Sequence, residues 1–169
     1  NFPYLLEDLD LKIIKDLLNK NQTLIIGATR IDNSKYYNSL INVNPTVVSY
    51  FDKKILVPFG EFLPLRDKLT FFENIVGPDN YSKGNQNRII NLSNNISYIP
   101  VICYEIVFYW KLLNQINYRS NFIVNITNDF WFGDYLGPYQ HLYLTKIRAA
   151  EYNKPIIRVS NNGISALID

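Results

Sequence analysis

The stretch SYIPVICYEI, residues Ser97–Ile106, indicates the fold class. Its apolar run predicts a buried β-strand that delivers the only cysteine, Cys103, into a sharp turn followed by a helix. A nucleophile at such a turn projects beyond the sheet edge, and the backbone N–H groups that follow, beginning with Tyr104, can stabilise an oxyanion. A lone cysteine after an apolar run is more often a small buried hydrophobic residue. The rest of the chain must decide between these two interpretations.

The composition predicts one folded domain and excludes several classes of function. The chain has 169 residues, of which 47% are hydrophobic, enough for one substantial core. The 17 basic and 15 acidic residues are well mixed, so neither nucleic-acid binding nor a polybasic membrane patch is indicated. One cysteine excludes an internal disulfide. One histidine, one cysteine and scattered acids form no metal-ligand spacing, and the glycines form no phosphate-binding loop, so we expect neither metal nor cofactor.

Periodicity and turn signals predict alternating helices and strands. We expect helices over 5–20, 106–116 and 139–151, and strands over 23–30, 36–51 with a break near 44–45, 121–127, 155–160 and 164–168. Residues 52–64 contain two prolines and a glycine, which predicts an ordered loop, and residues 66–95 read as a polar excursion with at most a short helix at 69–75. The order predicts a layered α/β fold with polar clusters at the strand ends.

Six short motifs follow one another along the chain. They are Lys53–Pro64 (KxxLVPFGEFxP), Ile102–Glu105 (ICYE), Asn125–Gly133 (NITNDxWFG), Gly137–His141 (GPxQH), Arg148–Glu151 (RAxE) and Arg158–Ala166 (RxSNNGISA). In this order and spacing the chain resembles the nitrilase (carbon–nitrogen hydrolase) superfamily and, within it, the apolipoprotein N-acyltransferases. The resemblance implies a four-layer α-β-β-α sandwich, here a single domain over residues 1–169 that is incomplete at both ends.

The resemblance also implies a Glu–Lys–Cys triad. Cys103 would be the nucleophile, Lys53 the residue that holds the thiolate and the tetrahedral oxyanion, and Glu61 a second, supporting glutamate. A free thiol has a pKa near 8.5 and is mostly protonated at neutral pH, so a neighbouring ammonium favours the nucleophilic thiolate. Without the motif, Lys53 would read as a solvated loop lysine, as Lys54 does.

The general-base glutamate of that triad is missing from this sequence. The resemblance places it shortly before a proline that Pro3 matches, so we expect it just before Asn1. Glu7 lies in the predicted helix and is not its replacement. We therefore expect the chain to be a piece of a longer polypeptide and to be inactive by itself, because such a base contributes about 10²–10⁴-fold.

Tyr104 and Glu105 follow the nucleophile directly. Tyr104 would lend its amide to the oxyanion hole, whereas Glu105 would either orient the turn or pair with an arginine such as Arg158. His141, the only histidine, is placed by the resemblance at a helix start away from the triad and is read as structural.

The acyl pocket is implied by two further aromatic residues. Trp131 and Phe132 resemble the wall of that pocket, and the alternative is ordinary core packing. Phe130 stands where the family usually has a small residue, and Lys146 stands where an arginine is common.

Three functions remain open. The leading hypothesis is an N-acyltransferase domain that moves a fatty acyl chain from a phospholipid, through a cysteine thioester, to the amine of a diacylglyceryl-cysteine apolipoprotein. It would lie on the periplasmic side of the bacterial inner membrane, held there by helices outside this chain. The alternatives are a soluble nitrilase or amidase and a non-catalytic remnant of a split or decayed gene.

Overall fold

The computed structural model describes residues 5–64, 80–93, 95–115, 119–133 and 135–169. Its elements in chain order are η1 (Leu6–Asp8), α1 (Leu11–Leu17), β1 (Leu24–Asp32), β2 (Lys35–Val43), β3 (Val48–Asp52), β4 (Ile90–Ser93), β5 (Ile96–Ile102), η4 (Cys103–Val107), α3 (Tyr109–Leu113), β6 (Phe122–Asn128), η5 (Asp129–Phe132), α4 (Gly137–Tyr152), β7 (Ile156–Asn161) and β8 (Ala166–Ile168). The short helix expected over 69–75 lies outside the described residues.

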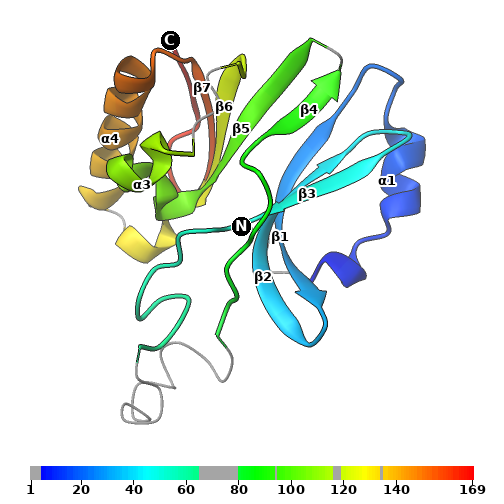
Figure 1. Ribbon diagram of the computed structural model, residues 1–169, viewed down its shortest axis with the longest axis horizontal. Coiled ribbons are helices and arrows are strands. Elements are labelled where there is room, and N and C mark those ends of the chain that lie inside the picture. The colour runs from blue at the N-terminus through cyan, green and yellow to red at the C-terminus, as the bar shows by residue number, and fades with distance from the viewer. Residues whose placement is uncertain (1–4, 65–79, 94, 116–118, 134) are drawn as a thin grey trace.

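Two sheets form the centre of the molecule. β1, β2 and β3 make an antiparallel sheet, and β4 to β8 make a second sheet in sequential order. Within the second sheet β5, β6 and β7 are parallel, whereas β4 and β8 pair antiparallel at its two edges. Figure 1 shows the two sheets side by side, with α1 against the first sheet and α3 and α4 against the second. The parallel strands β5 and β6 are mainly apolar because both of their faces are covered.

Three apolar clusters correspond to the three contacts between layers. Leu40 and Phe51 of the first sheet pack on Tyr98 and Ile102 of the second. The outer face of the first sheet packs against residues of η1 and α1, and the outer face of the second packs against η4, α3 and α4. This arrangement confirms the predicted four-layer α-β-β-α sandwich.

The strands agree with the sequence predictions better than the helices do. The helix expected over 5–20 is shorter, because the Asp10 side chain accepts the N–H groups of Lys12 and Ile13 and so caps α1. The helix expected over 106–116 begins three residues earlier, as the 3₁₀ turn η4, and continues as α3. Strand β4 was not predicted and lies in the polar excursion, where it pairs with β5.

The inner face of the second sheet continues beyond the first sheet. Ile157 and Val159 on β7 are paired with Val124 and Ile126 of the inter-sheet core, yet they are 39% and 51% exposed. Leu167 on β8 is paired with Ile157 and is 77% exposed. The sandwich is therefore covered most completely over β5 and β6, where the sequence placed the nucleophile.

Candidate active site

Cys103 occupies the turn between β5 and η4, as the sequence predicted. Its backbone has φ of +52°, a left-handed conformation that residues with a Cβ rarely adopt. Such a conformation persists when the surrounding structure enforces it and is found often at active sites. The side chain is partly buried and packs at the edge of the cluster between the two sheets.

Glu105 is buried completely and ties this turn to the loop after β3. One carboxylate oxygen, Oε2, accepts the N–H of Ile102 at 2.9 Å. The other, Oε1, accepts the N–H groups of Lys54 and Ile55, each at 3.0 Å. The Arg88 guanidinium donates to both oxygens, at 2.8 and 2.9 Å. Glu105 therefore orients the turn and also pairs with an arginine.

The arginine partner is Arg88 and not Arg158, the example that the sequence suggested. The two side chains of this ion pair are both 0% exposed. Burial by itself would raise the pKa of Glu105, but the charge and hydrogen bonds of Arg88, together with the charge of Lys53, lower it below its usual value. Arg88 belongs to the polar excursion, where the sequence offered no sign of a buried charge.

Lys53 and Glu61 form an ion pair in which the lysine is buried and the glutamate is partly exposed. Lys53 Nζ lies 2.7 Å from Glu61 Oε2, and the Lys53 side chain is 1% exposed. The Asn38 amide donates to Glu61 Oε1 at 2.6 Å, and the backbone N–H of Val57 donates to Oε2 at 2.9 Å. The carboxylate is therefore held from three sides, and it holds the ammonium in turn.

The loop that carries both residues is ordered, as predicted, for reasons of local geometry. Phe59 has φ of +62° and its N–H donates to the Phe62 carbonyl at 2.8 Å, which closes a tight turn that contains Glu61. The backbone of Lys53 donates to the Asn38 carbonyl at 2.8 Å and accepts the N–H of Gly84 at 2.9 Å. Two neighbouring segments therefore fix the position of Lys53.

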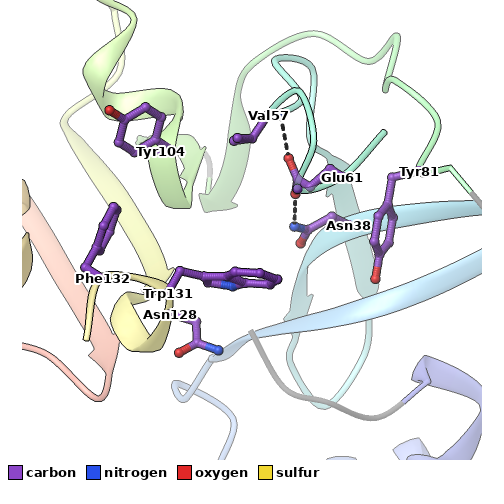
Figure 2. Close-up of a pocket in the computed structure, with 9 residues that line it drawn as sticks. Asn38, Val57, Glu61, Tyr81, Tyr104, Asn128, Trp131 and Phe132 are labelled. Atoms are coloured by element: carbon purple, nitrogen blue, oxygen red, sulfur yellow. Dashed lines mark hydrogen bonds between the residues drawn. The ribbon is translucent and has the colours of Figure 1, made fainter. Parts of the chain in front are cut away.

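A pocket of about 400 Å³ opens beside the Lys53–Glu61 ion pair. Its lining residues are Asn38, Val57, Gly60, Glu61, Tyr81, Tyr104, Asn128, Trp131 and Phe132. Figure 2 shows Tyr104 and Phe132 on one side, Glu61 and Tyr81 on the other, and Trp131 between them. The structure thus brings Glu61, Tyr104 and both predicted wall residues to one cavity.

The aromatic side of the pocket is open to solvent. The Tyr104 and Phe132 rings are 6.0 Å apart, whereas Trp131 is 69% exposed. The alternative interpretation of Trp131 as a core residue therefore does not hold. Phe130 is 70% exposed and is not among the lining residues, so its size does not narrow the cavity.

A second buried cluster of charges lies at the ends of β6 and β7, and sequence analysis missed it as a unit. Asp129 Oδ2 accepts Arg158 Nη2 at 2.6 Å and the Ser160 hydroxyl at 2.9 Å, and its Oδ1 lies 2.8 Å from His141 Nδ1. Burial alone would raise the pKa of Asp129, but the His141 hydrogen bond and the Arg158 charge keep it below its usual value. His141 also packs its ring 5.8 Å from that of Tyr104, next to Cys103. The sequence signal that could have revealed this cluster is the presence of Arg158 and Ser160 inside the motif of strand β7.

Neither a metal site nor a membrane span is found in the part of the chain that the structure describes. No group of three or more histidine, cysteine or acidic side chains there could hold a metal ion. None of the helices there is long and apolar enough to cross a bilayer.

Comparison with known proteins matches nearly the whole chain. Residues 6–169 match the family model described as carbon-nitrogen hydrolase. The chain is 40% identical to the apolipoprotein N-acyltransferase of Rhizobium leguminosarum over 180 aligned residues, which cover 99% of this chain and 34% of that protein. The corresponding enzyme of Brucella melitensis is 36% identical, again over 99% of this chain and 34% of its own length. The chain thus spans about one third of the curated relatives it matches.

Solved structures agree on the fold. A CN-hydrolase superfamily protein of Xanthomonas campestris, solved with an arsenic adduct in its active site, aligns with a TM-score of 0.66 at 15% identity, over 99% of this chain and 62% of that one. A nitrilase-superfamily member of Saccharomyces cerevisiae aligns with a TM-score of 0.59 at 18% identity, over 89% of this chain and 49% of that one.

Proposed function

The chain belongs to the carbon–nitrogen hydrolase family, and we propose that it is the catalytic domain of an apolipoprotein N-acyltransferase. The acyl donor is a phospholipid, and the acceptor is the N-terminal amine of a diacylglyceryl-cysteine apolipoprotein. Over the aligned region, which covers 99% of the chain, the chain is 36–40% identical to relatives named for this activity. The reaction needs neither metal nor cofactor.

Cys103 is the nucleophile of a two-step transfer. Its thiolate attacks the ester carbonyl of the phospholipid, and the tetrahedral intermediate releases the lysophospholipid hydroxyl, which takes up a proton. The acyl group is then bound to Cys103 as a thioester. The acceptor amine attacks this carbonyl and loses a proton, the thiolate leaves, and an amide is formed.

Lys53 supplies the positive charge that both steps need. Its ammonium stabilises the thiolate and the oxyanion of each tetrahedral intermediate, and the Tyr104 backbone N–H is a second donor to the oxyanion. Glu61 holds the ammonium in place, because both of its oxygens are already occupied by Lys53, Asn38 and Val57. Glu105 joins the nucleophile turn to the Lys53 loop, because its carboxylate accepts the N–H groups of both Ile102 and Lys54.

The general base is a glutamate that the family motif places before Asn1. Glu61 and Glu105 cannot take its role, because each is bound in an ion pair to Lys53 or Arg88. Within the described residues, Glu61 is the one carboxylate among those that line the pocket. We place this domain at the periplasmic face of the bacterial inner membrane, as part of a protein of the length of its relatives, of which the chain spans 34%.

One observation supports a lipid substrate over a small amide. The pocket beside the Lys53–Glu61 pair is walled by Tyr104, Trp131 and Phe132 and is open at Trp131, which is 69% exposed. An open aromatic wall suits an acyl chain that enters from a membrane, whereas a small amide would be enclosed by polar groups. A soluble amidase of the same family is the second candidate.

The test is acylation of Cys103 in the polypeptide encoded by the natural gene. The protein is incubated with glycerophospholipid vesicles, quenched in acid and digested, and the mass of the Cys103 peptide is measured. We expect an added mass of one acyl chain that hydroxylamine removes and that a lipopeptide with a free N-terminal amine discharges as an amide. Cys103→Ala is the control.

Two results would contradict the proposal. Ammonia release from small amides, with no acyl group retained from vesicles, would indicate an amidase. A polypeptide that is folded but forms no thioester from either donor would indicate the non-catalytic remnant.

A further inference from the structure

We propose that Arg158 is a positioning residue for this reaction: through Asn125 it holds the Cys103 carbonyl and so maintains the left-handed turn that presents the thiol. The inference rests on the proposed role of Cys103 as the nucleophile. Arg158 and Asn125 lie outside the triad, and neither lines the pocket.

Asn125 and Arg158 stand in one row across three parallel strands. In the sheet register Val101 on β5 is opposite Asn125 on β6, and Asn125 is opposite Arg158 on β7. Both polar side chains are buried, at 0% and 1% exposure. Two polar residues in the middle of apolar strands need partners, because an unpaired buried polar group is costly.

Asn125 is the residue of this row that reaches the nucleophile turn. Its side-chain amide donates to the Val101 carbonyl at 3.2 Å and to the Cys103 carbonyl at 3.5 Å. Glu105 holds the preceding peptide through the N–H of Ile102. The turn is therefore held on both sides of Cys103, as its φ of +52° requires.

Arg158 determines which way the Asn125 amide faces. Arg158 Nη1 donates to Asn125 Oδ1 at 2.8 Å. A guanidinium has donors and no acceptor, so the amide oxygen must face Arg158 and the amide NH₂ must face the two carbonyls. Without the arginine the amide could reverse, which would place its oxygen against the carbonyl of Cys103.

Arg158 is itself anchored from several elements. Its Nη2 donates to Asp129 Oδ2 at 2.6 Å, its Nε to the Ile164 carbonyl at 3.2 Å, and its Nη1 also to the Thr145 hydroxyl at 3.2 Å. Burial lowers the pKa of Arg158, although the charge and hydrogen bond of Asp129 oppose this shift. The hydrogen bonds from Arg158 to these groups hold the guanidinium in place beside Asn125.

The test measures the reactivity of the thiol and does not depend on acyl transfer. The rate of Cys103 alkylation by iodoacetamide is followed across pH in the natural polypeptide and in its Arg158→Lys and Asn125→Ala variants. We expect each variant to react about tenfold more slowly at pH 7, because the strained turn that presents the thiol is no longer held through Asn125.

Arg30→Lys is the matched control. Arg30 makes a comparable two-point contact with Asp52, at 2.7 and 3.1 Å, in the other sheet. We expect this variant to keep the parent alkylation profile although it loses similar hydrogen bonds. If Asn125→Ala does not fold, Asn125→Asp decides, because it keeps the shape and the oxygen facing Arg158 but cannot donate to the Cys103 carbonyl.

Two outcomes would overturn the inference. One is a folded Asn125 variant in which the rate of Cys103 alkylation at each pH equals that of the parent. The other is an Arg30→Lys profile displaced as far as that of Arg158→Lys, which would indicate a general loss of stability. If the parent forms no thioester but the variants still alter alkylation, the proposed function fails and the positioning role stands.

Discussion

Replacing Glu105 by glutamine removes a single negative charge from the interior while leaving the shape of the side chain almost unchanged. Glu105 and its partner Arg88 are both 0% exposed, and the carboxylate also accepts the N–H groups of Lys54, Ile55 and Ile102. In the variant the guanidinium remains buried without a counter-ion. The amide NH₂ also points a donor at groups that previously donated to the carboxylate.

The magnitude follows from this loss of a buried counter-ion. Breaking a buried ion pair by removing one partner costs about 3–5 kcal/mol. The free energy of unfolding of such a domain is about 5–15 kcal/mol, so the variant should lose about a fifth or more of its stability. For a chain of 169 residues each kcal/mol corresponds to about 2–4 °C, and the melting temperature should fall by roughly 6–20 °C.

The pH dependence adds a second signature. The pKa of Glu105 is lowered in the folded protein, so its stabilisation is present above the unfolded pKa of about 4.3 and is lost as the pH falls through the lower folded value. The free energy of unfolding of the parent should therefore decline steeply below about pH 5. In Glu105→Gln part of this slope should disappear, and Asp52 and Asp129, whose pKa values are also lowered, should supply the remainder.

Urea unfolding followed by far-ultraviolet circular dichroism measures both effects. Fluorescence is a weaker probe, because Trp110 and Trp131 are already 65% and 69% exposed in the folded chain. Glu151→Gln is the control. Glu151 pairs with Arg148 and its side chain is 36% exposed, so this substitution should lower the free energy of unfolding by less than about 1 kcal/mol. A Glu105→Gln variant no less stable than Glu151→Gln would refute the argument.

Three further substitutions test the site. Lys53→Met should lower the rate of Cys103 acylation by about 10²-fold or more, measured by peptide mass, whereas the neighbouring Lys54→Met should change it only a few-fold. Trp131→Ala should weaken acylation from phospholipid about tenfold with little effect on the unfolding midpoint, and the equally exposed Trp110→Ala should leave acylation unchanged; equal losses in both would contradict an acyl wall at Trp131. Gly84→Ala should destabilise the fold by about 1–3 kcal/mol, because the added Cβ would collide with the backbone at the end of β3, next to Lys53; an unchanged urea midpoint would show that this contact is not tight.

The sequence predicted most strands and the nucleophile turn from local properties. The apolar run before Cys103 and the Asn161-Asn162-Gly163 turn each combine a buried strand with a break, and both were found where expected. Strand β4 was missed because Ile90–Ser93 is short and depends on its partner β5 more than on its own pattern.

The roles of the charged residues could be read only in part. The motif brought Lys53 and Glu61 into one loop, and the ion pair between them agrees with that expectation. The partner of Glu105 could not be derived, because Arg88 and Arg158 are equally plausible from sequence and are both buried.

What the sequence determined by itself is the layered α/β fold, the family and the order of the predicted catalytic residues, since each depends on neighbours along the chain. The tertiary structure decided which arginine meets which carboxylate, and that the row from Asn125 to Arg158 ends at the Cys103 carbonyl. These pairings join residues tens of positions apart, and strand register and layer packing set them through distances of a few ångströms that no local pattern encodes.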